Sequence, residues 1–258
     1  MSGLRKHSED GILTLTIDRQ TVANALDPVT MDQLSSTVAN AAREGARVII
    51  LTGAGDRFFC AGIDIKAAAA ADSMGDNTFV DSFAGVHRSL FEVVSESDVP
   101  ILAAVNGAAV GAGLELTLAC DLVIGSETAK FSVPEAKRGM AAHFASIMLQ
   151  RRISPALAMD MLLTGEAIDA FEALRRGLII SVTTPGRLME TVQAKARTIA
   201  ANAPLSVSRI RRMARRSREL PVVAALRLDE FPNPYLSEDR IEGLRAFVEK
   251  RAPVWKGK

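Results

Sequence analysis

PILAAVNGAAVGAGLELTLACD, residues 100–121, is an apolar segment with a single ionisable residue, Glu115, before its final aspartate. Hydropathy alone would suggest a membrane span. The Asn106-Gly107 pair signals a turn, however, and further glycines follow it. Since a turn and a carboxylate would both be costly in hydrocarbon, we expect these residues to form buried core and no membrane helix.

The Gly/Ala run of this segment leads into a predicted helix that begins near Gly113. Free N–H groups at a helix start, together with the positive end of the helix dipole, favour a developing anion. A phosphate loop is excluded because no Gly-Lys-Ser/Thr sequence follows. Glu115 is either a satisfied buried carboxyl or a reactive one with a raised pKa, and its spacing leaves both readings open.

Strand and helix signals alternate on either side of this segment. Residues 12–17 alternate apolar residues with Thr, and residues 47–52 form a continuous β-rich run typical of a strand covered on both faces. Further strands are predicted over 101–105 and 121–125, and helices after Asp27 and over 79–94. This rhythm predicts a mostly parallel sheet flanked by helices.

Helical periodicity dominates from about residue 154, and only residues 178–183 read as a strand there. The predicted helices are 154–164, 169–176, 187–202, 204–218, 222–231 and 238–250.

The composition of the chain limits the classes of function that it can have. The 258 residues carry 31 Lys+Arg and 30 Asp+Glu, which argues against a nucleic-acid or anionic-lipid binder. Two cysteines, Cys60 and Cys120, cannot form a disulfide framework, and no Cys/His cluster has zinc-ligand spacing. With no secretory signal visible at the start, we expect a cytoplasmic protein.

Two further segments could form either ligand-binding sites or ordinary turns. In FFCAGIDI (58–65), small residues allow a ligand close to the backbone, and Asp64 could cap a following helix. A plain strand–loop–helix turn is the alternative. In KFSVPEAKRG (130–139), Pro134 fixes the chain ahead of Glu135, which could start a helix or point into a cleft.

Taken together, these segments resemble the crotonase (enoyl-CoA hydratase/isomerase) superfamily. The residues that carry the resemblance run nearly end to end in collinear order: NAL (24–26), FCAGIDI (59–65), the 100–121 segment, AKFSVPEAKRG (129–139), LTGE (163–166) and EKRAPVWKG (249–257). The resemblance implies an α/β fold, the crotonase-like ββα spiral of the ClpP/crotonase type. It also implies two near-perpendicular sheets, with a core over 1–200 that holds the CoA-thioester site. Residues 201–258 would form a C-terminal helical oligomerisation region of a homo-trimer or hexamer.

The resemblance also implies a site. The N–H groups of Ile63 and Ala112 would polarise a thioester carbonyl as an oxyanion hole. Glu115 and Glu135 would share the catalytic proton work, Glu115 chiefly positioning water and Glu135 chiefly transferring a proton. The remaining residues expected to contact the CoA thioester are Ala25, Ala61, Gly62, Asp64, Ile65, Gly111 and Gly139.

The function so implied is an enoyl-CoA hydratase, which adds water syn across a trans-2-enoyl-CoA. A double-bond isomerase needs one base, so two glutamates favour the hydratase. The PEAKRG run (134–139) is also similar to carnitinyl-CoA dehydratase-like members, and a non-catalytic acyl-CoA or RNA-binding relative is the third reading. We expect no metal and no redox cofactor, since coenzyme A is part of the substrate. We expect no membrane and no nucleic acid among its partners.

Two places need explanation. Relatives carry a glycine-rich turn after the second glutamate, whereas this chain has GMAAHFASI (139–147), with His143, Phe144, Ala145 and Ser146 in the altered part. This change predicts a narrowed or reshaped acyl pocket. Residues 209–218 hold six arginines, which favours a solvated basic helix over a CoA-phosphate or subunit contact or an RNA site.

Overall fold

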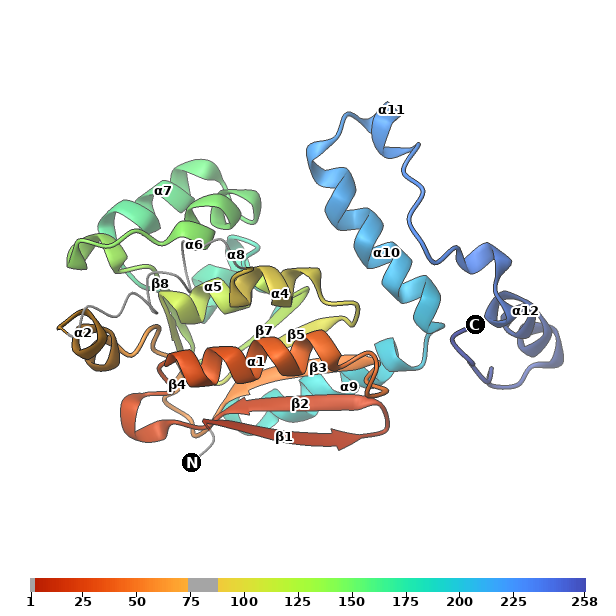
Figure 1. Cartoon of the computed structure of the whole chain (residues 1–258), viewed down its shortest axis with the longest axis horizontal. Coiled ribbons are helices and arrows are strands. Elements are labelled where there is room, and N and C mark those ends of the chain that lie inside the picture. Colours follow the sequence, from red (N-terminus) through yellow and green to blue (C-terminus); the bar gives the residue numbers. More distant parts are fainter. Residues whose placement is uncertain (1–2, 74–87) are drawn as a thin grey trace.

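A six-stranded sheet forms the centre of the molecule (Figure 1). The structure, a computed structural model, describes residues 3–73 and 88–258. In this sheet β1 pairs antiparallel with β2 and every other neighbouring pair is parallel. Its strands, in spatial order, are β1 (Leu4–Glu9), β2 (Ile12–Ile17), β3 (Val48–Gly53), β5 (Ile101–Val105), β7 (Leu122–Ser126) and β10 (Ser181–Thr183). The predicted mostly parallel sheet is confirmed, while β1 was not anticipated.

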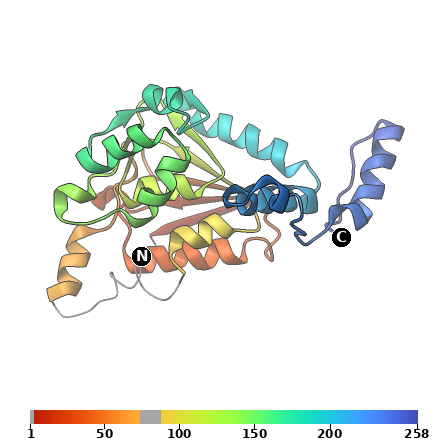
Figure 2. The same cartoon turned by 90° about the horizontal axis from the view of Figure 1, so that it is seen from above.

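Helices cover both faces of this sheet. α1 (Pro28–Asn40) and α4 (Leu90–Glu96) pack together on one face, and α9 (Leu188–Ala200) packs on the other (Figures 1 and 2). Every residue of β3 is buried, which explains its continuous apolar run. α1 begins as predicted: the Asp27 carboxylate accepts the Thr30 N–H at 2.8 Å, and Pro28 occupies the first helical position.

A second, four-stranded sheet was missed by the periodicity because its strands are only two or three residues long. It consists of β4 (Phe58–Cys60), β6 (Ala108–Val110), β8 (Lys130–Ser132) and β9 (Ile168–Asp169). The chain passes from β3 to β4, from β5 to β6 and from β7 to β8, each time from the large sheet to the small one. Helices α2 (Ile65–Ser73) and α5 (Ala112–Ala119) follow the first two of these pairs. This repeat is the expected ββα spiral.

Most of the predicted helices are present in the second half. They are α7 (Pro155–Thr164), α8 (Ala170–Arg175), α9, α10 (Pro204–Arg216), α11 (Val222–Ala225) and α12 (Glu238–Glu249). Helix α6 (His143–Met148) was not predicted. The helix predicted over 222–231 ends at Ala225, after one turn. Of the helix predicted over 79–94, residues 79–87 lie outside the described residues and α4 accounts for the rest. Among the helices of the described chain, none is long and apolar enough to cross a membrane.

Helix α10 lies beside the core, whereas α11 and α12 extend away from it (Figures 1 and 2). This extended C-terminal part exposes many large apolar side chains, among them Val222, Val223, Leu226, Phe231, Tyr235, Leu236, Leu244, Phe247 and Val248.

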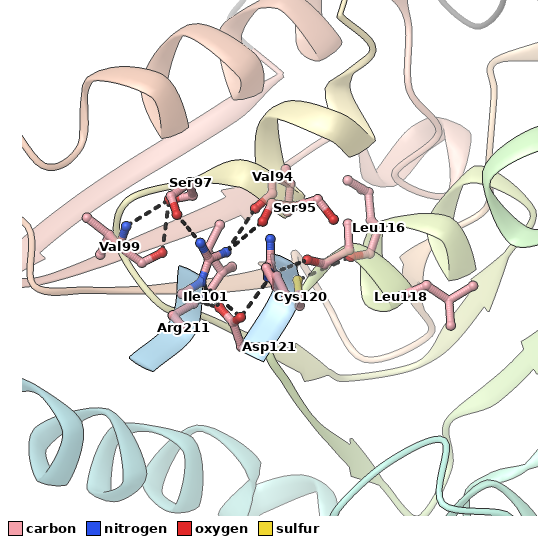
Figure 3. A network of polar contacts seen from close by, with 12 residues as sticks. Val94, Ser95, Ser97, Val99, Ile101, Leu116, Leu118, Cys120, Asp121 and Arg211 are labelled. Atoms are coloured by element: carbon pink, nitrogen blue, oxygen red, sulfur yellow. Dashed lines mark hydrogen bonds and ion pairs between the residues drawn. The ribbon is translucent and has the colours of Figure 1, made fainter. Parts of the chain in front are cut away.

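The basic segment of α10 is not the solvated helix that its composition favours. Arg211 is 8% exposed and its Nε donates to both carboxylate oxygens of Asp121, at 2.9 and 2.8 Å. Its other two nitrogens donate to the carbonyls of Val94, Ser95 and Ser97, at the end of α4 (Figure 3). The arginines fasten α10 to the core because they satisfy carbonyls that no helical N–H can reach.

Candidate active site

The two predicted oxyanion donors lie where two turns of the spiral meet. Leu26 and Ile63 form an isolated parallel bridge, in which Leu26 N–H donates to the Gly62 carbonyl and Asp64 N–H to the Leu26 carbonyl, each at 2.8 Å. In a parallel pairing of this kind, the residue that is bracketed by the two bonds points its own N–H away from its partner. The Ile63 N–H therefore faces away from Leu26.

The turn at Ile63 is in direct backbone contact with the start of α5. A Cβ on Gly62 would lie 3.0 Å from the Val110 carbonyl oxygen and 3.6 Å from the Ala112 nitrogen. A Cβ on Gly113 would lie 2.1 Å from the Cys60 carbonyl oxygen. Only glycine allows this approach, so the small residues noted in the sequence bring the two segments together.

Ala112 is the first residue of α5, so its N–H has no acceptor inside the helix. Across residues 3–73 and 88–258, no hydrogen bond satisfies the N–H of either Ile63 or Ala112. Two unsatisfied N–H groups thus lie on adjoining segments.

Glu115 lies in the first turn of α5 and is 4% exposed. Its Oε1 accepts the Ala145 N–H at 2.8 Å. The pKa of Glu115 is raised to about 7, chiefly by burial and also by the charge of Glu135, and these two effects outweigh the lowering effect of the Ala145 and Phe144 N–H groups. Near neutral pH the carboxyl therefore exists in both forms, as a group that exchanges a proton needs.

Glu135 opens a short 3-10 helix, Glu135–Arg138, directly after Pro134. Its Oε1 lies against Gly111, where a Cβ would be only 2.2 Å away. Its Oε2 is buried and has no hydrogen-bond partner within the described chain. Burial also raises the pKa of Glu135. One carboxyl oxygen thus remains available beside the residue that precedes Ala112.

The altered turn becomes helix α6. Phe144 is half-buried and its ring stacks on Phe91 of α4, with the centroids 5.4 Å apart. Ala145 supplies the N–H that holds Glu115. His143 is exposed. The altered turn therefore supplies a backbone N–H to the first glutamate.

The other residues predicted to contact the CoA thioester differ in their surroundings, and some of them have a structural role. The Asp64 carboxylate is committed to the Ala67 N–H at 3.2 Å, which confirms its predicted role as a helix cap. Ala25 is buried, Ala61 is half-buried and Ile65 is exposed at the start of α2. Gly139 ends the 3-10 helix at a φ of +69°, and a Cβ there would meet no described atom within 4 Å.

Arg19 is a residue that the sequence did not single out. Its Nη2 contacts Asp27 at 2.9 Å and Asp64 at 3.1 Å, and its Nη1 donates to the Ala25 carbonyl. It therefore links the caps of α1 and α2 on both sides of the Ile63 turn. Its partners are 6 to 45 positions away in the chain, and no local pattern signals such a contact.

Comparison with known proteins bears on the family of this chain. The enoyl-CoA hydratase/isomerase family profile matches residues 7–258. The carnitinyl-CoA dehydratases of Salmonella typhi and Escherichia coli K12 are each 38% identical over 255 residues, which cover 96% of this chain and 95% of theirs.

Solved enoyl-CoA hydratases have the same fold. The enzyme from Bacillus anthracis superposes with a TM-score of 0.92 at 29% identity, and that from Mycobacterium marinum with 0.89 at 33%. Both comparisons cover 100% of each chain. The chain belongs to the enoyl-CoA hydratase/isomerase family, the crotonase superfamily, and has its fold.

Proposed function

We propose that this protein is an enoyl-CoA hydratase that adds water to trans-2-enoyl-CoA thioesters and dehydrates 3-hydroxyacyl-CoA in reverse. One observation carries the proposal. Two glutamates in different environments, Glu115 and Glu135, accompany two unsatisfied N–H groups on adjoining segments. Two carboxyls whose surroundings differ can divide the roles of base and acid.

The reaction begins with the thioester carbonyl oxygen between the N–H groups of Ile63 and Ala112. Water adds to Cβ, the electrons of the double bond move toward the carbonyl, and the oxygen becomes enolate-like. Each donor of such a hole contributes roughly 10²–10³ in rate. The dipole of α5 acts in the same direction because its N-terminus faces the developing charge.

The protons are exchanged by the glutamates. Glu115 in its ionised form takes the proton of the attacking water, and Glu135 in its protonated form delivers a proton to Cα. Glu115 then releases its proton and Glu135 takes one up, so the net change is one water added. Because the charge of Glu135 raises the pKa of Glu115, protonation of one carboxyl is linked to that of the other. We assign the CoA moiety to the surface near Ala25, Ala61, Ile65 and Gly139. The thioester supplies the activation and the protein supplies placement and dipoles.

A carnitinyl-CoA dehydratase activity is the second candidate, and the relatives at 38% identity favour it. It is the same chemistry in the dehydration direction, on an acyl group that carries a quaternary ammonium. A pure isomerase would use one base, so the pairing of both glutamates favours hydration or dehydration.

We further propose that residues 201–258 form the oligomerisation region of a homo-trimer or hexamer. The apolar side chains of α11 and α12 support this, because exposed patches of this kind mark protein interfaces. Analytical ultracentrifugation of the full chain and of Phe247→Glu tests it. A trimer or larger species that the substitution dissociates is expected, and a monomer at all concentrations would refute it.

The activity is tested by following the enoyl-thioester absorbance across trans-2-enoyl-CoAs of increasing chain length, with carnitinyl-CoA assayed in parallel. Turnover of simple enoyl-CoAs supports the hydratase, and the best chain length gives the size of the acyl pocket. Turnover of carnitinyl-CoA alone favours the second candidate. Tight thioester binding without any turnover would refute both.

A further inference from the structure

A cavity of about 710 Å³ lies between the end of α5, helix α6 and the C-terminal half of α10. It is separate from the proposed reaction site, because it adjoins the C-terminal end of α5 while Ala112 lies at the other end. An eight-residue helix separates the two by about 12 Å. Five arginines line this cavity: Arg151, Arg152, Arg211, Arg215 and Arg218. We call it the arginine cavity.

Three carboxylates also line the arginine cavity, and each is already paired. Asp121 is held by Arg211 at 2.8 Å and by Arg215 at 3.0 Å. Glu219 pairs with Arg151 at 2.8 Å. Glu96 pairs with Arg88, which is not among the lining residues.

This leaves two positive charges without a carboxylate partner in the described chain, those of Arg152 and Arg218. The Nη2 of Arg152 donates to the carbonyls of Leu118 and Cys120, at 3.2 and 2.6 Å, and its Nε is buried without a partner among the described residues. Arg218 donates only to the Arg151 carbonyl, at 2.7 Å.

The two guanidinium groups also repel each other. Burial lowers the pKa of Arg152, and the nearby charge of Arg218 lowers it further. Arg218 is exposed, whereas the Nε of Arg152 is buried without a partner among the described residues, and a buried charge left unpaired is costly. Two adjacent guanidinium groups therefore match one doubly charged anion.

We propose that the arginine cavity binds a phosphate- or sulfate-type oxyanion, held chiefly by Arg152 and Arg218. The planar fork of a guanidinium suits the oxygens of such an anion. The bound anion would neutralise the positive charges of Arg152 and Arg218, which lie at the C-terminal end of α5. Because the site lies apart from the glutamates, it does not depend on the proposed function.

Isothermal titration calorimetry of the full-length protein with sodium sulfate, at constant ionic strength in a chloride background, tests the proposal. Calorimetry is chosen over thermal melting because sulfate stabilises most proteins by exclusion from their surface. Inorganic phosphate is titrated in parallel. We expect saturable binding with one anion per chain.

Two variants and a control localise the site. Arg152→Leu and Arg218→Gln should each weaken binding about tenfold or more, since a charged hydrogen bond contributes about 1.5–3 kcal/mol. Arg218→Gln disturbs only one hydrogen bond and tests the proposal even if Arg152→Leu fails to fold. Arg43→Gln is the matched control at an exposed arginine in the turn that follows α1, which does not line the arginine cavity, and it should bind as the wild type does.

Competition with an enoyl-CoA separates the two sources of the anion. Sulfate that binds equally well beside a saturating thioester identifies a free anion as ligand, and sulfate that is displaced identifies a phosphate of CoA. No saturable binding, or binding that both variants retain, would overturn the proposal. So would loss of the oligomer in Arg218→Gln without any anion binding, because a carboxylate of a second copy would then fill the cavity.

Discussion

Gly111→Ala probes the contact between Gly111 and Glu135. The added Cβ would lie 2.2 Å from Oε1 of Glu135, so the carboxylate must retreat by about 1.2 Å to reach an ordinary contact near 3.4 Å. The obstructing atom is the end of a flexible side chain, so the protein can adapt without unfolding. The φ of +54° at Gly111 adds backbone strain of about 1–3 kcal/mol.

The consequence for turnover is larger than that for stability. A displacement of about 1 Å at a reacting group can cost about 100-fold in rate. We therefore expect kcat for enoyl-CoA hydration to fall by about two orders of magnitude while the thioester still binds. Stopped-flow loss of the enoyl absorbance gives kcat, and urea unfolding gives the stability of the same preparation.

Gly177→Ala is the matched control. Gly177 also has a positive φ, +76°, but a Cβ there meets nothing within 4 Å. It should lose comparable stability and keep full turnover. If Gly111→Ala kept wild-type kcat, Glu135 would not act from the position that the structure gives it, and the reasoning would fail.

Three further outcomes are expected. The pKa of Glu115 is about 7 in the folded chain against an ordinary 4.5, so the folded state binds the proton more tightly than the unfolded state does. The free energy of unfolding of the protein should therefore fall by about 3 kcal/mol as pH rises from 4.5 through 7. Glu115→Gln should lack this slope and be more stable than the wild type at pH 8 in urea unfolding; parallel pH curves would contradict the buried carboxyl. Arg211→Met should cost about 3–5 kcal/mol, since it breaks a buried ion pair and leaves the carbonyls of the α4 end without their donor, whereas Arg212→Met at a more exposed pair should cost under about 1 kcal/mol. Equal losses in the two variants would mean that the buried pair does not anchor α10. Arg19→Met should loosen the Ile63 turn and lower kcat about tenfold or more. Arg5→Met, which removes an ion-paired arginine whose side chain is 64% exposed, should leave kcat unchanged. An unaltered kcat in both variants would mean that Arg19 does not position the oxyanion donors.

The long elements of the fold could be predicted because each carries its own pattern. The helix after Asp27 has a capping carboxylate and a first-position proline, and the 47–52 run is apolar on both faces. The second sheet could not be predicted from periodicity, since two or three residues do not define a period. Its presence followed only from the resemblance to the crotonase superfamily.

The candidate site could also be predicted only in part from the sequence. The glycine runs predicted close backbone approaches, and Gly62 and Gly113 make them. The partners of Glu115 and of Asp121 could not be predicted, because the Ala145 N–H and the Arg211 guanidinium come from segments 30 and 90 residues away. The stacking of the Phe144 ring on Phe91 could not be predicted either, because the contact depends on the tertiary fold.

The division of labour between the glutamates is tested most directly by comparing the wild type, Glu115→Gln and Glu135→Gln on one trans-2-enoyl-CoA. Turnover is followed by enoyl absorbance, and thioester binding is measured separately by calorimetry. Both variants should bind the thioester within a few fold of the wild type and lose turnover by orders of magnitude. Wild-type turnover in either variant would contradict the account, because that glutamate would then transfer no proton in the reaction.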